Sequence, residues 1–416
     1  MSWLIALVIL AFFIVFHELG HFLVARACGV KVEVFSLGFG KRLLSFEYKG
    51  TLYALSAIPL GGYVQLKGQQ EAFIESSATS EVRESKQPLD SKQGSVCARS
   101  AAARGSAPSP DTKFVQQTCN KIIESSATSE ITESNTSQTQ THSSDSFLAK
   151  SPLQRIAILL AGSGFNLLLG FLLYVCVYLY GVASVPPIVG EVLDSMPAQE
   201  AGILPGDRIL EINGAEIHTW EELSKLVRDS IGAISMRAQR GESQLDFTLM
   251  PRLVDSKTAN VFGEFIKHNA IGITAAHQTQ IVRYTGFHAI TKAWEKTIES
   301  SKLILQSLQK LISGAIGVQN ISSVVGITHT MASFAQSDLV ALLALSALIS
   351  INLGIFNLLP IPPLDGGHIL FTLYQSLTRK KPSERVASAI MIAGLALLLG
   401  IMSLGVYNDI NRIMAP

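Results

Sequence analysis

The stretch "FIVFHELGHFLVA", from Phe13 to Ala25, lies within an apolar run that is long enough to cross a membrane. It nevertheless contains His17, Glu18 and His21. An ionisable side chain in the hydrocarbon region is energetically costly, so it is normally kept where it performs chemistry or lines a polar cavity. The stretch therefore predicts a membrane-spanning helix that carries a polar functional site.

The spacing of the two histidines indicates what this site does. His17 and His21 are four residues apart, so on a helix they share one face and can reach the same metal ion, while Glu18 projects from the adjacent edge. In the zincin pattern two imidazoles bind zinc and the glutamate takes a proton from the bound water. This pattern favours hydrolysis over the alternative, a buried polar triad that joins helices by hydrogen bonds.

A third metal ligand is needed, because catalytic zinc usually has three protein ligands and one open position. The segment "NLLPIPPLDGGH" follows an apolar run, and its prolines must interrupt a helix there. An unwound segment could aim the Asp365 carboxylate at the zinc, with His368 as the rival ligand, and position favours Asp365. Asn357 is a candidate for binding the substrate carbonyl or oxyanion, or for bonding the backbone carbonyls that the prolines release.

The composition is that of a membrane protein. Hydrophobic residues make up 48% of the 416 residues and charged residues only 16%. A net charge of +1 without a concentrated basic face argues against a nucleic-acid partner. The apolar segments that approach the length of a transmembrane helix span residues 3–25, 156–182, 339–359 and 386–406.

The distribution of Lys and Arg predicts the orientation of these spans. Basic residues gather between the first and second spans and again between the third and fourth. Because positive residues favour the cytoplasmic side, we expect both loops to be cytoplasmic. Both termini and the segment between the second and third spans would then lie in the periplasm, across a bacterial inner membrane.

The segments outside the spans differ in composition. Alternating residues after the first span predict β-hairpins that re-enter the membrane, and a Ser/Thr-rich stretch predicts a disordered cytoplasmic loop. Apolar residues at helical spacing predict an amphipathic helix from Phe287 to Ile312, either on the membrane surface or packed on a neighbouring domain. The expected division is 1–68 (first transmembrane helix and re-entrant hairpins), 69–150 (disordered loop), 151–183 (second transmembrane helix), 184–252 (a compact α and β domain), 253–337 (periplasmic connector with the amphipathic helix) and 338–416 (third and fourth transmembrane helices).

The compact domain resembles a known module. The order "AG…PGD.I..ING", within residues 185–251, is similar to a PDZ domain, which takes a peptide or chain end as an added strand. We therefore expect a polytopic α-helical membrane protein with four transmembrane helices, a re-entrant β-sheet and one extramembrane PDZ-like α+β domain.

Two motifs and this domain order together resemble the site-2 protease family of intramembrane zinc metalloproteases. The motifs are "HELGH" in the first span and "NLLPIPPLDGG" at the end of the third. The resemblance implies one zinc ion on His17, His21 and Asp365, with Glu18 as the general base, and so favours Asp365 over His368.

The second span matches the family in part. Asn166 stands at the family's asparagine position, although "GSGFN" replaces the usual Gly-Pro before it, and "SSVVGI" departs from the family pattern before the third span. These changes put secondary contacts in doubt and leave the metal ligands intact. The candidates for substrate binding or oxyanion stabilisation are Asn357 and Asn166.

The resemblance implies a function as well as a site. The expected substrates are transmembrane segments of membrane-anchored regulators such as anti-sigma factors, or remnant signal peptides. The main alternative is a catalytically idle membrane scaffold that captures chain ends with the PDZ-like domain. A metal transporter would need polar residues along a pathway, and the second and fourth spans contain almost none.

Overall fold

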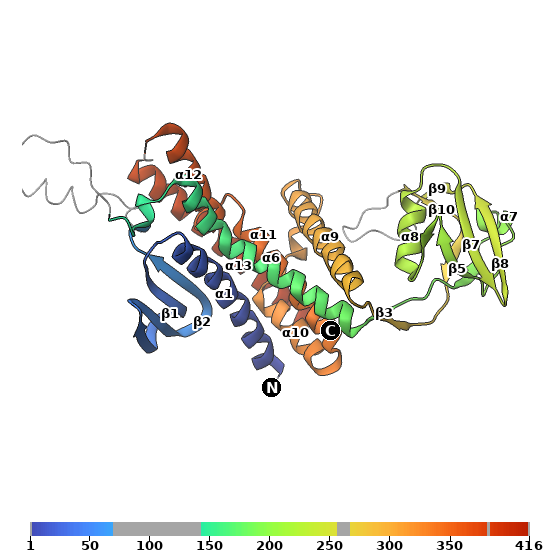
Figure 1. Ribbon diagram of the computed structural model, residues 1–416, viewed down its shortest axis with the longest axis horizontal. Coiled ribbons are helices and arrows are strands. Elements are labelled where there is room, and N and C mark those ends of the chain that lie inside the picture. Colours follow the sequence, from blue (N-terminus) through green and yellow to red (C-terminus); the bar gives the residue numbers. More distant parts are fainter. Residues whose placement is uncertain (1, 70–142, 256–266, 381–382, 415–416) are drawn as a thin grey trace, which may run out of the picture.

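The computed structural model describes residues 2–69, 143–255, 267–380 and 383–414. Within these ranges four helices have the length and apolar composition to cross a membrane, as predicted. They are α1 (Ser2–Ala27), α6 (Pro152–Tyr180), α11 (Leu339–Asn357) and α13 (Glu384–Met414), and they lie in the helical part of the molecule in Figure 1. Most of the loop expected at 69–150 lies outside the described residues.

Helix α6 lies in the middle of the bundle and contacts both α1 and α11. Both contacts depend on glycines. A Cβ at Gly20 of α1 would collide with the Ala161 carbonyl of α6, and a Cβ at Gly170 of α6 would collide with Ile351 of α11. Small residues let helix backbones approach closely where lipid provides no hydrophobic driving force between helices. The position of α6 therefore sets the positions of both neighbours.

The predicted hairpin sheet lies beside α1 and consists of β1 (Val32–Tyr48) and β2 (Thr51–Leu66). The strands bend, so residues 34–37 lie opposite 62–65 and also opposite 52–55. Among the described pairings, 62–66 has a strand partner on one side only. Gly62 lies against α1, because a Cβ there would be 3.1 Å from Cγ of Glu18. A strand edge is thus held next to the helix that carries the predicted site.

The predicted end of the disordered loop is wrong, because residues 143–150 fold against this sheet. Lys67 Nζ donates to Asp145 Oδ1 at 2.8 Å, and the Lys31 N–H donates to the Asp145 carbonyl at 2.9 Å. Phe147 begins a short 3-10 helix (Phe147–Ala149) and is only 1% exposed. Burial of this aromatic ring provides hydrophobic stabilisation that the serine-rich composition around it does not indicate.

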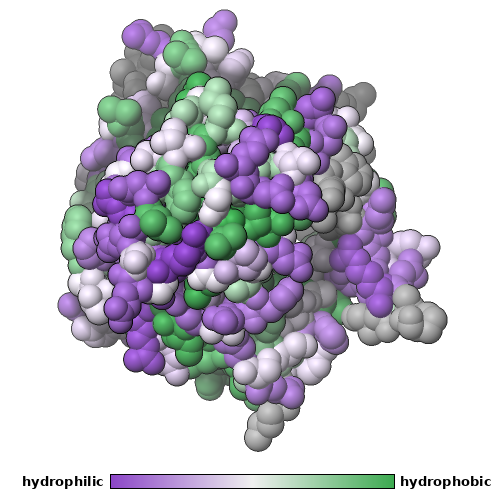
Figure 2. Space-filling model, turned by 90° about the vertical axis from the view of Figure 1, so that its right-hand side faces the viewer, coloured by the Kyte–Doolittle hydropathy of each residue, from purple (hydrophilic) through white to green (hydrophobic). Residues whose placement is uncertain are grey.

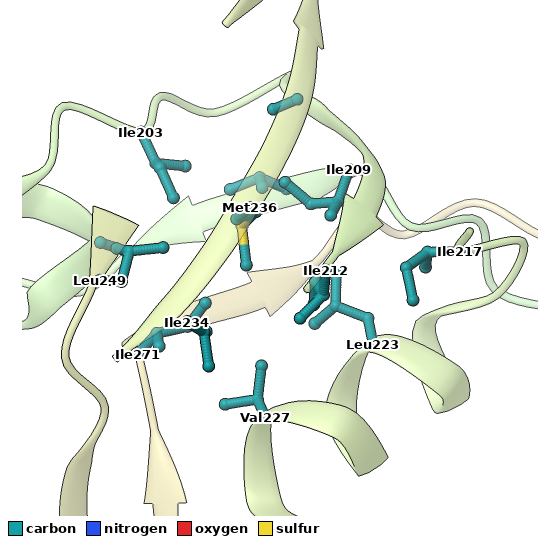
Figure 3. Close-up of a cluster of buried hydrophobic side chains, with 13 residues drawn as sticks. Ile203, Ile209, Ile212, Ile217, Leu223, Val227, Ile234, Met236, Leu249 and Ile271 are labelled. Carbon is teal, nitrogen blue, oxygen red and sulfur yellow. The ribbon is translucent and has the colours of Figure 1, made fainter. Parts of the chain in front are cut away.

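A small α+β domain follows α6. Its main sheet has the strand order β6-β5-β7-β8. Figure 3 shows Leu223 and Val227 of the domain's longer helix directed toward Ile212, Ile234 and Met236 of the sheet, and all five side chains are buried. The elements are β3 (Val182–Ser184), β4 (Val189–Val192), α7 (Pro197–Glu200), β5 (Arg208–Ile212), β6 (Ala215–Glu216), α8 (Trp220–Asp229), β7 (Ile234–Arg240) and β8 (Ser243–Leu249).

The predicted boundary between this domain (184–252) and a connector (253–337) is wrong. After β9 (Arg252–Asp255), the chain continues through β10 (Lys267–Ala270) and β11 (Ile273–Ala275), which pair with β9 and β4. Ile271 lies in the same hydrophobic core and is 2% exposed. Strand β12 (Gln280–Val282) then pairs with β3. The physical reason is that β4 needs a partner for its backbone groups, and β11 satisfies them.

Helix α9 (Phe287–Ile312) has the predicted bounds and packs on α6 and α11. Its contact face consists of small residues, including Ala289 and Ala293, and the Tyr174 hydroxyl lies 3.0 Å from Ser300 Oγ. The apolar residues that predicted the helix, such as Phe287, Trp294 and Ile312, stay exposed, so this packing does not decide between the membrane surface and a neighbouring domain. Two further helices were not predicted. They are α10 (Val324–Ser337), which packs on α1, and α12 (Asp365–Thr378).

The last turns of α13 form hydrogen bonds with residues 318–326, which lie before and at the start of α10. Asp409 is 2% exposed, and its Oδ2 accepts hydrogen bonds from the Ser323 N–H, the Ser323 hydroxyl and the Gly326 N–H. Asn408 Nδ2 donates to the Val318 carbonyl at 2.8 Å. A carboxylate at a helix N-terminus also interacts favourably with the helix dipole. These contacts connect the C-terminal span to the rest of the chain.

The surface differs between the small domain and the spans. Viewed from the small-domain end of the molecule, hydrophilic residues cover much of the surface and hydrophobic residues are scattered among them (Figure 2). Large hydrophobic side chains are exposed along the spanning helices, for example Leu4, Val8, Ile392 and Leu399. Rows of exposed apolar side chains along helices of this length are typical of a surface that lipid covers, so we assign the helical part to the membrane.

Within the small domain, Asp207 explains the "PGD" turn. Its carboxylate is 1% exposed and accepts hydrogen bonds from the Leu204 N–H at 2.9 Å and from two N–H groups of Arg240 at 2.7 Å. Burial alone would raise the pKa of Asp207, but the Arg240 guanidinium and the Leu204 N–H lower it below its ordinary value. The turn is thereby joined to β7.

We predict that Asp207→Asn loosens the small domain, because the substitution removes the charge that Arg240 contacts. Hydrogen–deuterium exchange of β5 and β7 in the full-length protein at pH 7 should show an opening free energy lower by about 1–2 kcal/mol, with solvent screening taken into account. Since the pKa of Asp207 is lowered by folding, the wild-type advantage should be complete above the unfolded value of about 3.9. It should disappear as the pH falls through the lower folded value.

The control for this prediction is Asp246→Asn, which breaks an exposed pair with Arg237 of 2.8 Å. Exposed ion pairs contribute little, so exchange should hardly change. Equal effects of the two substitutions, or a wild-type advantage that persists at low pH, would contradict the role given to Asp207.

Candidate metal centre

Helix α1 brings the two histidines together in the interior of the bundle. His17 and His21 are each 8% exposed, and their Nε2 atoms lie 3.2 Å apart. The spacing of four residues on one helix face accounts for this approach, as expected from the sequence. Two imidazole nitrogens thus point to the same place.

The third member of the cluster comes from the other end of the chain. Helix α11 ends at Asn357, residues 358–364 are not helical, and Asp365 is the first residue of α12. Asp365 Oδ2 lies 3.1 Å from His17 Nε2 and 3.2 Å from His21 Nε2. The interruption predicted from the prolines therefore occurs, and it ends with the carboxylate next to both imidazoles.

Helix α6 leaves room for the cluster. Gly162 lies directly against both rings, because a Cβ there would collide with His21 Nε2 and would lie 2.7 Å from Cε1 and 2.8 Å from Nε2 of His17. Real Cβ atoms essentially never make contacts that short. Any side chain at this position would therefore occupy the space in which the three ligand atoms meet.

Helix α6 also contacts the Nδ1 atoms of both histidines, the ring nitrogens that do not face Asp365. His21 Nδ1 lies 2.8 Å from the Ile158 carbonyl oxygen. The Asn166 amide nitrogen lies 3.2 Å from His17 Nδ1, and Asn166 is completely buried. Partners of this kind fix the orientation and the tautomer of an imidazole whose other nitrogen binds a metal. Both Nε2 atoms are thereby left facing Asp365.

Glu18 lies between this cluster and the hairpin sheet. It is half-buried on α1, next to His17 in sequence, and its Cγ would be 3.1 Å from a Cβ at Gly62 of β2. The β2 backbone at Gly62 therefore passes close to Glu18.

Asn357, His368 and Asn166, the other residues predicted from the sequence, lie outside the group of three ligand atoms. Asn357 is half-buried at the end of α11, at the opposite end of the 358–364 segment from Asp365. Among the described residues, the group of ligand atoms that could share a metal ion comprises His17, His21 and Asp365, and His368 is not one of them. Asn166 contacts His17. The sequence had instead suggested that Asn166 binds the substrate or the oxyanion.

Sequence reasoning missed Gly162 and the Ile158 carbonyl. A backbone carbonyl has no signature in the sequence, because every residue carries one. Gly162 did have a signal. The string "AGSG" places small residues within about one and a half turns before Asn166, as expected where a helix passes close to other side chains.

The donor set fits zinc. Two imidazole nitrogens and one carboxylate oxygen are ligands that catalytic zinc sites use, and three protein ligands leave one coordination position open. Asp365 Oδ2 is buried and makes no hydrogen bond of good geometry, although two ring nitrogens lie within 3.2 Å of it. Three ligand atoms directed at one point, with Gly162 leaving the space beside them, are what a bound cation requires.

Comparisons with known proteins agree with this geometry. The sequence model of peptidase family M50 matches residues 5–401. A Campylobacter jejuni protein named "Putative zinc metalloprotease" is 36% identical over 99% of this chain and 94% of its own length. The "Regulator of sigma-W protease RasP" of Bacillus subtilis is 29% identical over 98% of this chain and 97% of its own length.

A solved structure is similar to the small domain. It is the PDZ domain of an SdrC-like protein from Listeria monocytogenes, which is 20% identical. The similarity covers 22% of this chain and 86% of that chain, with a TM-score of 0.17 over the whole comparison.

The family match extends over nearly the whole chain, from the first span into the fourth. The relatives that cover the chain from end to end are named as metalloproteases or as a protease. The chain is therefore a zinc metalloprotease of the membrane, and it belongs to peptidase family M50, the site-2 protease family.

Proposed function

We propose that this protein hydrolyses peptide bonds within the transmembrane segments of other membrane proteins. The observation that carries the proposal is the position of the cluster. His17 and His21 are buried in a helix long enough to cross a membrane, and Asp365 meets them among the other spanning helices. A hydrolytic site at that depth is of use only for a substrate that lies in the membrane.

In this proposal His17, His21 and Asp365 hold one zinc ion. When bound, zinc acts as a Lewis acid and makes hydroxide available near neutral pH. Glu18, next to the ligands, accepts the proton of the attacking water and returns it to the leaving amine nitrogen. Asn357 donates a hydrogen bond to the carbonyl oxygen on which negative charge develops.

The hairpin sheet is positioned to present the substrate. A scissile bond inside a helix is hydrogen-bonded and sterically hidden, so the substrate helix has to unwind. Residues 62–66 of β2 lie next to Glu18 and have a strand partner on one side only among the described pairings. An unwound substrate added along this edge would be held extended beside the glutamate. A re-entrant position of the sheet at membrane depth is part of this proposal.

We further propose that the protein lies in a bacterial inner membrane. Lys and Arg near the ends of the spans favour a cytoplasmic position for the loops after the first and third spans. The small domain between the second and third spans is then periplasmic. There its PDZ-like fold would bind a peptide or chain terminus and act as a filter against substrates with bulky outer domains.

The proposed substrates are membrane-anchored regulators of the anti-sigma type, already trimmed outside the membrane, or remnant signal peptides. The Bacillus subtilis relative named as a regulator of sigma-W supports the first of these classes. Membership in a metalloprotease family, together with the presence of His17, Glu18, His21 and Asp365, argues against the idle-scaffold alternative.

We predict that Glu18→Gln strongly slows proteolysis and leaves zinc binding intact, because the amide keeps the shape of the side chain and cannot accept the water proton. Cleavage of a tagged single-span reporter by the purified protein in detergent should fall by about 10²- to 10⁴-fold. A chelator should stop the wild type, and added zinc should restore it. Glu299→Gln, an exposed change on α9, is the matched control and should cut normally.

Two results would count against this role of Glu18. One is undiminished cleavage by Glu18→Gln. The other is loss of cleavage together with loss of zinc, which would make Glu18 a structural residue of the site instead of the base.

We predict that Gly162→Ala disrupts the metal site without a change at any proposed ligand. The added methyl group would collide with His21 Nε2 and His17, so the rings or α6 must move. Zinc content measured after dialysis, and reporter cleavage, should both fall at least about tenfold. Gly164→Ala is the matched control, because a Cβ there meets nothing within 4 Å. Normal zinc content in Gly162→Ala would show that the site tolerates the methyl group.

A further inference from the structure

The two histidines have chemically different outer partners. The Ile158 carbonyl beside His21 Nδ1 can only accept a hydrogen bond, so His21 carries a proton on Nδ1 and presents an Nε2 lone pair to the cluster. The Asn166 amide beside His17 Nδ1 contains both a donor and an acceptor. The tautomer of His17 is therefore governed by the way this amide is turned.

Asn166 is held firmly at its backbone and has one unused polar atom at its side chain. The residue is completely buried, and its carbonyl accepts a 2.8 Å hydrogen bond from the Ser350 hydroxyl of α11. Its Cβ would lie 3.3 Å from a Cβ at Gly354, so α11 also packs closely against it. The amide nitrogen faces His17, whereas Oδ1 is buried without a hydrogen-bond partner. A buried polar atom without a partner is costly and calls for a physical explanation.

We propose that Asn166 is the positioning residue for His17, and that its Oδ1 accepts a hydrogen bond from His17 Nδ1–H when the zinc site is loaded. The inference rests on the proposed role of His17 as a ligand. An imidazole that binds metal through Nε2 carries its proton on Nδ1 and needs an acceptor there. A half-turn of the Asn166 amide supplies that acceptor to His17 and moves the amide nitrogen to the position that Oδ1 occupies in this structure.

An amide suits this position better than an acceptor-only group. With its nitrogen toward the ring, Asn166 donates to a His17 that is unprotonated at Nδ1 and carries its proton on Nε2, where Asp365 Oδ2 lies 3.1 Å away. With its oxygen toward the ring, it accepts from a His17 that binds metal through Nε2. The same residue therefore satisfies His17 in both states without adding a second buried carboxylate to the site. Asn166 acts on the ligand, not on the substrate.

The test is the zinc affinity of the full-length protein in detergent, measured by competition for Zn²⁺ with a chromophoric chelator. Asn166→Leu keeps the approximate size and removes both polar atoms, so affinity should fall about 10- to 100-fold. Asn166→Asp keeps an acceptor at Oδ1 and should restore affinity to within a few-fold of the wild type, or above it. Ser163→Ala is the matched control on α6, because Ser163 is also completely buried and its hydroxyl makes no hydrogen bond. It should bind like the wild type.

A second readout separates ligand positioning from general loosening of the helices. The visible absorption bands of the Co²⁺-substituted protein report the geometry of the bound imidazoles. They should shift in Asn166→Leu, return in Asn166→Asp and stay unchanged in Ser163→Ala. Should Asn166→Leu fold poorly by circular dichroism, Asn166→Ala provides the same loss of polar atoms with a smaller side chain.

Two outcomes overturn the inference while the proposed function stands. Wild-type zinc affinity in Asn166→Leu would mean that the residue only fills space. Equal losses in Asn166→Leu and Asn166→Asp would mean that the amide donor, not the oxygen, is what His17 needs. A third outcome, unchanged zinc affinity in His17→Ala, would remove the ligand assignment itself and the inference with it.

Discussion

The contact between two imidazoles and one carboxylate among apolar helices is the constraint on which the rest of the structure depends. Each group alone would be costly to bury there. Together, His17, His21 and Asp365 place their ligand atoms within 3.2 Å of one another, an arrangement that a shared cation stabilises. The histidines come from the first helix and the aspartate from α12, so the helices between them must bring distant parts of the chain into contact.

Helix α6 helps to bring the three ligand residues together through four residues along one side of the helix. Ile158, Gly162, Asn166 and Gly170 are spaced by four, which places them near one another along one side of a helix. In order, they supply a carbonyl to His21, space for the ligand atoms, an amide to His17 and a close contact with Ile351 of α11. The second span therefore contributes no ligand and yet determines whether the ligands can meet.

The sequence allowed much of this to be predicted, for identifiable reasons. Hydrophobic length revealed the four spans, and the HExxH spacing revealed His17 and His21. The proline-rich break left Asp365 and His368 as candidates for the third ligand, and the family resemblance favoured Asp365. The closing strands of the small domain were missed because pairing of β11 with β4 is a long-range contact. Phe147 was missed because its serine-rich surroundings masked one large buried ring. The roles of Gly162 and Asn166 required knowledge of which helix faces which, and periodicity alone does not provide that.

The order in which the chain is made gives the position of Asp365 a further meaning. A ribosome produces His17 and His21 first, and the carboxylate that completes the cluster emerges only after both the second and third spans. An unfinished chain in the membrane thus contains the histidines and Glu18 without their partner. A protease that could cut neighbouring membrane segments during its own insertion would be hazardous. Because the cluster is divided between the first span and the segment after the third, the proposed hydrolytic site can form only after three spans have been made.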